Sequence, residues 1–166
     1  MTPIISKAKV TLSTTGICLI LCAASASAAD NQPLSKAMQK IEQNHNAKTY
    51  AIEATEYKDR EVYEFETLRN GEFYESLIDP QNGQMLSDEK EDATFLWTPL
   101  NDEQKQAFTQ TKISLWQAIE TVSDKNNSSI KEASFKVDNN KSYFEIIFEN
   151  GAKYIVDGIS GDVQKI

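Results

Sequence analysis

The side chains that most often carry catalysis or bind metals are scarce in this chain of 166 residues. His45 is the single histidine and lies between two asparagines, and the two cysteines, Cys18 and Cys22, lie in an apolar N-terminal stretch. A catalytic nucleophile needs a base within hydrogen-bond reach, and zinc needs several His or Cys ligands. The sequence supplies neither set, so we expect no catalytic residue, no metal site and no cofactor.

Carboxylates are the one abundant reactive group, with 25 Asp and Glu residues against 17 Lys and Arg residues and a net charge of −8. Paired carboxylates can act as general acid and base, but no spacing selects one pair among so many. A carboxylate-dependent hydrolase is therefore the weakest of three functional hypotheses. The negative charge argues against nucleic acid or anionic lipid as a partner and favours a basic protein.

The segment 1–29 has the order of a secretory signal peptide. Lys7 and Lys9 precede a largely apolar stretch, and small residues over Ser25–Ala29 suit a signal peptidase. We expect cleavage after Ala28 or Ala29, with an uncleaved anchor as the alternative. Neither cysteine follows a small residue, as a lipid-attachment site would require. The mature chain is then periplasmic or secreted, free of disulfides and not bound to the membrane.

Two tight turns of the same composition mark hairpins. Asn70-Gly71 and Asn150-Gly151 each stand between alternating segments, and Asn-Gly favours a type I′ turn because both central residues need positive φ. Each following strand closes on an Asp with a Gly four residues later. The carboxylate can accept backbone N–H bonds, and the glycine can take the left-handed conformation. These closing residues are Asp79 with Gly83 and Asp157 with Gly161.

A helix and strands are predicted around each pair of turns. Apolar residues in the first half fall at i, i+3, i+4 and i+7, which places them on one helix face. The same spacing recurs in the second half, after a capping box made by Ser114 and Gln117. These two stripes are Leu34, Ala37, Met38 and Ile41, and Leu115, Ala118, Ile119 and Val122. Strands are expected at 49–57, 62–68, 72–78, 84–86, 130–137, 142–148, 152–156 and 163–164.

The repeated order predicts an α+β protein of two related units, each a helix packed on an antiparallel sheet of three to four strands. The first unit occupies 30–86 and the second 113–166. Between them, 87–112 is an acidic and aromatic connector with a short helix. This connector is too apolar and too helical for a flexible tether, so we expect it to pack against both units.

The order of these features resembles the PepSY domain, a family named partly after peptidase propeptides. The resemblance implies a helix packed on an antiparallel sheet, a secreted or envelope location, and a role in binding or inhibiting peptidases. It supplies no catalytic residues. The matching residues are Ala37-Met38, Tyr63, Asn70-Gly71, Tyr74, Asp79 and Gly83 in the first copy, and Ala118-Ile119, Tyr143, Asn150-Gly151, Tyr154, Val156-Asp157 and Gly161 in the second.

The connector is the stretch that the repeat does not explain, and we place the partner contact there. Its apolar residues are candidate binding anchors, because aromatic side chains dominate interface energetics. Its acids would steer a basic rim of the partner. The alternative is that the aromatic residues are a plug that seals the two units together. The anchors are Phe95, Leu96 and Trp97, and the acids are Asp88, Glu89, Glu91 and Asp92.

The leading functional hypothesis is an exported, non-catalytic interaction module that binds or inhibits a peptidase in the cell envelope. The runner-up is an accessory protein of envelope signalling that contacts the sensor domain of a receptor. Both hypotheses require a protein partner. Capture of that partner would separate them.

Overall fold

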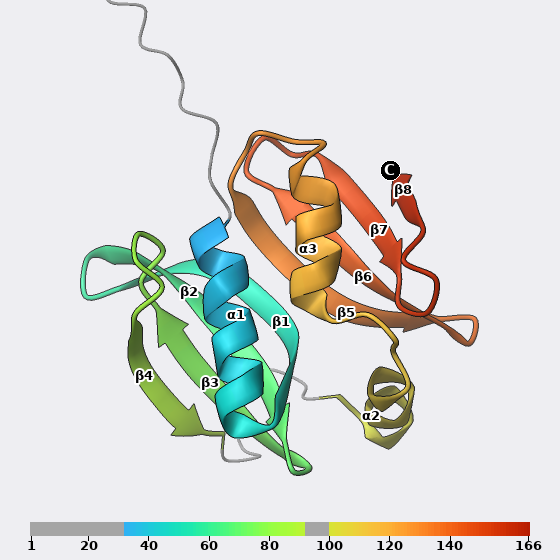
Figure 1. Ribbon diagram of the computed structural model, residues 1–166, viewed down its shortest axis with the longest axis horizontal. Helices are drawn as coiled ribbons and strands as arrows, with labels where there is room; N and C mark the ends of the chain where they lie inside the picture. The colour runs from blue at the N-terminus through green and yellow to red at the C-terminus, as the bar shows by residue number, and fades with distance from the viewer. Residues whose placement is uncertain (1–31, 92–99) are drawn as a thin grey trace, which may run out of the picture.

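A computed structural model describes residues 32–91 and 100–166 (Figure 1). These residues form an α+β fold with three helices and one antiparallel sheet of eight strands in the order β4-β3-β2-β1-β5-β6-β7-β8. The elements in chain order are α1 (Gln32–His45), β1 (Ala47–Tyr57), β2 (Arg60–Arg69), β3 (Glu72–Ile78), β4 (Met85–Lys90), α2 (Asp102–Thr109), α3 (Leu115–Ser123), β5 (Ile130–Asp138), β6 (Lys141–Phe148), β7 (Lys153–Asp157) and β8 (Val163–Lys165).

Two helices cover one face of the sheet. Figure 1 shows α1 and α3 side by side, with α1 over the strands of the first half and α3 over those of the second. Both predicted apolar stripes are confirmed as the buried faces of these helices, and each of their eight residues lies in the core. Opposite them, the core-facing strand residues include Ile52, Phe65 and Ala133. Both halves therefore share one hydrophobic core.

The predicted helix start at Ser114 is confirmed at atomic detail. The Ser114 side chain accepts a hydrogen bond from the Gln117 backbone N–H, and the Gln117 side chain accepts one from the Ser114 backbone N–H. Asn101 and Gln104 form the same capping box at the start of α2. Each box satisfies backbone N–H groups that the first helical turn leaves without a partner.

The strands of both halves are joined into a single sheet, which the sequence did not predict. β1 pairs with β5 over only three residues of each strand, with Ile52 opposite Ala133 at the centre. On one side this pairing ends at Ala51, next to a register shift between Thr49 and Ala51 in the pairing of β1 with β2. There the Phe108 ring of α2 packs between Tyr50 and Phe135, with ring centroids 6.1 Å and 5.0 Å away.

The predicted closing turns have the expected geometry. The glycines at the four turns all have positive φ: 88° at Gly71, 69° at Gly83, 82° at Gly151 and 78° at Gly161. In each closing turn the Asp carboxylate accepts backbone N–H bonds from its own loop. Oδ1 of Asp79 accepts one from Gln81, and Oδ1 of Asp157 accepts two, from Ile159 and Ser160. These two N–H groups hold the pKa of Asp157 below its usual range.

The fourth strand extends further than the sequence predicted. We expected the connector to begin at Ser87, but β4 continues through Lys90 and pairs with β3 along this stretch. Ser87 and the three charged residues after it are therefore part of the sheet. No helix among the described residues is long and apolar enough to cross a membrane.

Truncation of a fully buried helix residue tests the shared core. Ile119→Ala should lower the free energy of unfolding by about 2–5 kcal/mol, because it leaves a cavity under α3. Urea denaturation followed by circular dichroism measures this change. Glu120→Ala, at the exposed neighbouring position, is the matched control. Equal stability of the two variants would contradict the packing of α3 described above.

Candidate functional site

Glutamates line the face of the sheet that the helices leave uncovered. Ile52 and Phe65 point into the core, so the alternate residues of β1 and β2 point to the opposite face. Strand register places glutamates directly opposite one another on that face: Glu53 with Glu64, Glu66 with Glu75, Glu75 with Glu89, and Glu53 with Glu132. These six glutamates define what we call the acidic face. Like charges directly opposite on adjacent strands destabilise a sheet.

Two carboxyls of the acidic face titrate far above the ordinary value for Glu. The side chain of Glu66 is only 6% exposed, and burial, followed by the charges of Glu91, Glu64 and Glu75, raises its pKa to about 7. Burial and the neighbouring carboxylates, Glu75 first, also raise the pKa of Glu64 to about 7. The strain of placing like charges together is therefore concentrated on β2.

A buried hydroxyl lies in the same region. Ser134 of β5 lines a small hollow of the sheet together with Glu64, Glu66 and Glu132. Its Oγ atom is buried and has no hydrogen-bond partner among the described residues. Buried polar groups are usually paired, so this unpaired hydroxyl is an exception beneath the acidic face.

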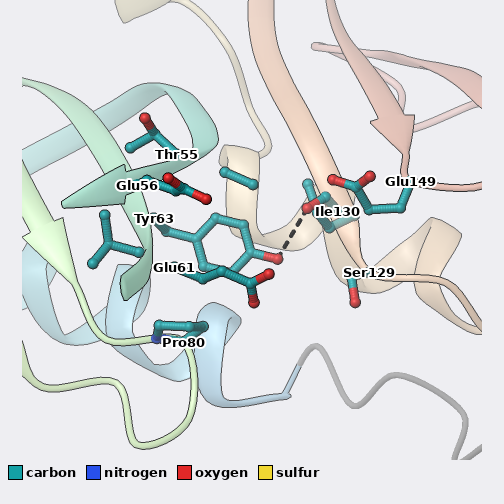
Figure 2. Close-up of a pocket in the computed structure, with 10 residues that line it drawn as sticks. Thr55, Glu56, Glu61, Tyr63, Pro80, Ser129, Ile130 and Glu149 are labelled. Carbon is teal, nitrogen blue, oxygen red and sulfur yellow. Dashed lines mark hydrogen bonds between the residues drawn. The ribbon is translucent and has the colours of Figure 1, made fainter. Parts of the chain in front are cut away.

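A cleft of about 350 Å³ opens at the other end of the β1–β5 pairing. Its walls come from the hairpin of β1 and β2, from the turn after β3, and from the start of β5 with the end of β6. Figure 2 shows Glu56 and Glu149 on opposite sides of this cleft. Its lining includes Thr55, Glu56, Glu61, Pro80, Ser129 and Glu149. The described residues that line it include three glutamates and no Lys or Arg.

A tyrosine bridges the floor of the cleft (Figure 2). Tyr63 of β2 donates its hydroxyl to the backbone carbonyl of Ile130 in β5, at 2.9 Å. Burial, followed by the charges of Glu149 and Glu61, raises the pKa of Tyr63 to about 12, so it remains a neutral donor. This bond ties the two halves together where β1 and β5 have already separated.

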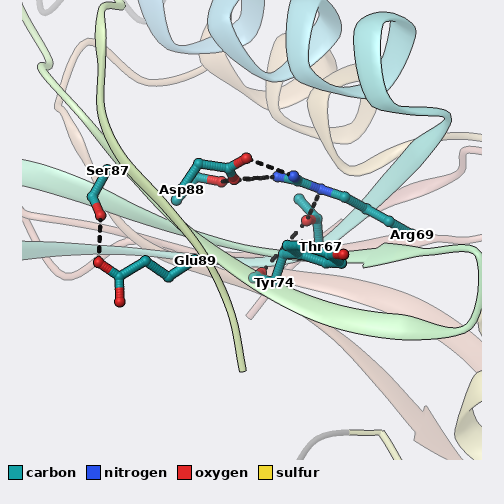
Figure 3. Close-up of polar contacts among 7 residues, drawn as sticks. Thr67, Arg69, Tyr74, Ser87, Asp88 and Glu89 are labelled. Atoms are coloured by element: carbon teal, nitrogen blue, oxygen red, sulfur yellow. Dashed lines mark hydrogen bonds and ion pairs between the residues drawn. The ribbon is translucent and has the colours of Figure 1, made fainter. Parts of the chain in front are cut away.

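Asp88, one of the acids predicted to steer a partner, forms an ion pair with the buried Arg69 (Figure 3). It receives two hydrogen bonds from Arg69, at 2.7 Å and 2.8 Å, and a third from the Ser76 hydroxyl at 2.6 Å. Arg69 also donates to Thr67 and lies over the Tyr74 ring. Hydrogen bonds from Arg69 hold the pKa of Asp88 below its usual range. The charge of Asp88 is therefore already paired within the fold, and its role in steering a partner stays a prediction.

The other predicted contact residues separate into two groups. Glu89 belongs to the acidic face, and Figure 3 shows it bonded to Ser87, away from Arg69. Glu91 lies two residues after Glu89. Burial, followed by the charge of Glu75, raises the pKa of Glu91. Asp92 and the anchors Phe95, Leu96 and Trp97 lie outside the described residues.

Sequence reasoning missed most of the acidic face. The signal was present, because Glu64 and Glu66 alternate on one strand and Glu75 follows the Asn-Gly turn in the next. Counting the hairpin register back from that turn would have placed Glu66 opposite Glu75. His45 is the exposed last residue of α1, and no group of three or more His, Cys, Asp and Glu among the described residues could hold a metal ion.

Residues 32–89, from α1 into β4, match PepSY, the peptidase propeptide and YPEB domain. This match covers 58 of the 166 residues of the chain. The chain is also similar to the crystal structure of a candidate lipoprotein from Clostridium difficile, with 21% sequence identity and a TM-score of 0.42, over 81% of this chain and 93% of that one. No curated protein matches the chain. PepSY domains are propeptide-like interaction modules and are in general not catalytic.

Removal of one partner of the buried ion pair tests its role in the PepSY domain. Asp88→Asn should lower the free energy of unfolding by about 2 kcal/mol or more, because it leaves the Arg69 charge uncompensated. Chemical denaturation measures the loss. Glu89→Gln, the adjacent residue on the other face of β4, is the control and should change stability by less than about 0.5 kcal/mol. A smaller loss for Asp88→Asn than for the control would overturn the structural role of the pair.

The acidic face also predicts how stability depends on pH. The folded-state pKa values of Glu64 and Glu66, about 7, lie above the ordinary 4.5, so the folded chain binds these protons more tightly than the unfolded chain. Their protonation therefore stabilises the fold below pH 4.5, and this contribution is lost as the pH rises through about 7.

Glu64→Gln combined with Glu66→Gln should remove most of that decline and be more stable than the natural chain at about pH 8. Urea unfolding at a series of pH values measures it, and Glu120→Gln should keep the decline. An unchanged pH profile in the double variant would show that these carboxyls titrate normally.

Proposed function

We propose that this protein is an exported, non-catalytic interaction module that binds and inhibits a peptidase of the cell envelope. The PepSY domain supports the propeptide-like part of the proposal. The N-terminal signal sequence supports export. The sequence offers no nucleophile and base at a catalytic spacing, which favours binding over turnover.

The observation that carries the proposal is the acidic face. Four directly opposed pairs of glutamates cost folding free energy, and a basic partner surface would offset that cost on binding. Glu75 and Glu89 are accessible to such a partner, since Glu75 is half-buried and Glu89 exposed. A basic rim around a peptidase cleft is the partner chemistry that fits.

We further propose that residues 113–166 are a second, related unit. The order of one helix followed by four antiparallel strands supports this, because α3 to β8 repeats the order of α1 to β4. The sheet order is also symmetric about the β1–β5 pairing. With β4 included, the first unit spans 30–90 and the connector begins at Glu91. Each unit would then leave its strands on the same uncovered face.

Affinity capture from an envelope extract, followed by an inhibition assay, tests the function. We expect a peptidase among the captured proteins, and we expect the purified chain to inhibit it. Glu75→Gln with Glu89→Gln should weaken capture, mainly by slowing association, and should flatten its salt dependence. Glu103→Gln with Glu120→Gln makes the same charge change at exposed positions on α2 and α3 and is the control.

Capture of a receptor sensor domain without a peptidase would favour the signalling role instead. Turnover of a hydrolase substrate would overturn the non-catalytic assignment. The connector anchors are tested separately with Trp97→Ala, which should weaken binding by about 2 kcal/mol or more if Trp97 contacts the partner. If Trp97 is a plug between the units, the same variant should lose stability instead and bind normally per folded molecule.

A further inference from the structure

The cleft borders an unpaired strand edge inside the sheet. β1 extends to Tyr57, but its pairing with β5 ends at Glu53 opposite Glu132. On that side, no strand among the described residues pairs with the last four residues of β1. Ala54, Thr55 and Glu56 of this edge line the cleft. Unpaired backbone groups along a strand are a ready template for an incoming strand.

The opposite wall prevents β5 from closing this gap. Tyr63 of β2 donates to the Ile130 carbonyl, so this carbonyl of β5 is bonded to a side chain and not to the backbone of β1. Pro80 forms part of the lining and cannot donate a backbone hydrogen bond. The edge of β1 beyond Glu53 is therefore left without a backbone partner from β5.

The charge of the cleft selects its occupant. Glu56, Glu61 and Glu149 approach it from two sides, and no Lys or Arg is among the described residues that line it. Val62, Tyr63 and Ile130 supply the apolar part of the lining. The volume of about 350 Å³ lies within the range of about 300–1,000 Å³ that ligand sites usually have.

We propose that this cleft binds an extended segment of a partner protein that carries lysine or arginine, and that the segment adds as a strand along residues 54–57 of β1. Backbone hydrogen bonds to β1 supply affinity, as in other cases of strand addition, and the three glutamates select basic side chains. This proposal deepens the proposed function and rests on it for the identity of the partner. The acidic face and the cleft are separate contacts, since none of the six glutamates of the acidic face lines the cleft.

The probe is a fluorescein-labelled, N-acetylated octapeptide of alternating threonine and lysine, measured by fluorescence anisotropy with the purified chain. We expect saturable binding that weakens as salt is added. An octapeptide of alternating threonine and glutamate should not bind. Hydrogen exchange with the lysine peptide should show new protection of the amides in 54–57. Absence of binding, or protection elsewhere only, would overturn the proposal.

Backbone pairing is tested with two further lysine peptides, N-methylated at the odd or at the even residues. Alternate amides point to opposite edges of a strand, so each version blocks one edge. Strand addition requires that at least one version lose binding by about tenfold or more, since a β-ladder depends on those N–H groups. If both versions bind as well as the parent peptide, charge alone holds the peptide and strand addition is wrong.

The charge requirement is tested with variants of equal charge change. Removing the three cleft carboxylates should weaken binding of the lysine peptide by about tenfold. The control variant should change the affinity for this peptide by less than about twofold. Equal effects of the two variants would overturn the site. The cleft variant is Glu56→Gln, Glu61→Gln and Glu149→Gln, and the control is Glu103→Gln, Glu120→Gln and Asp124→Asn, all exposed positions on α2, on α3 or directly after α3.

Two outcomes separate this inference from the proposed function. Glu75→Gln with Glu89→Gln should leave the affinity for the peptide unchanged, because both residues lie outside the cleft. Peptide binding without capture of a peptidase would support the cleft and overturn the proposed function. Self-association of the chain that the peptide competes away would assign the cleft to a second copy and overturn a foreign segment as its occupant.

Discussion

The architecture depends on the short pairing between β1 and β5. Ile52 opposite Ala133 lies at the centre of the three residue pairs that join two groups of four strands. Because this ladder is so short, other contacts complete the junction at each end. Phe108 of α2 packs between aromatic rings at one end, and the Tyr63 hydroxyl bonds to Ile130 at the other.

Charged residues are arranged differently on the two faces of the first four strands. On the helix side, Arg69 is buried and its charge is paired with Asp88, and it also donates to Thr67 and Ser76. On the other side, glutamates oppose glutamates, and Glu66 is buried among them. Burial of like charges lowers stability near neutral pH, so the fold retains a cost on this face. Proteins usually tolerate such a loss of stability at functional sites.

The elements could be predicted from sequence because their signals are local. The stripe spacing, the Asn-Gly turns and the capping residues each act within a few positions along the chain, and all eight strands follow from them. The junction and the sites could not be predicted in the same way. The pairing of Ala51 with Ser134 and the bond from Tyr63 to Ile130 join residues from different halves, and no local pattern encodes them. The ion pair of Asp88 with Arg69 could not be predicted for the same reason, because its partner lies on another strand.

The two outermost strands, β4 and β8, affect whether the protein aggregates at high concentration. An open sheet has two edges, and an exposed edge can recruit another molecule to form fibres. β8 has only three residues, and β4 carries the consecutive charges Asp88, Glu89 and Lys90. Short length and charge both oppose edge-to-edge growth. The chain can therefore keep an unpaired stretch of β1 for recognition, inside the sheet and beside glutamates, while its outer edges resist aggregation.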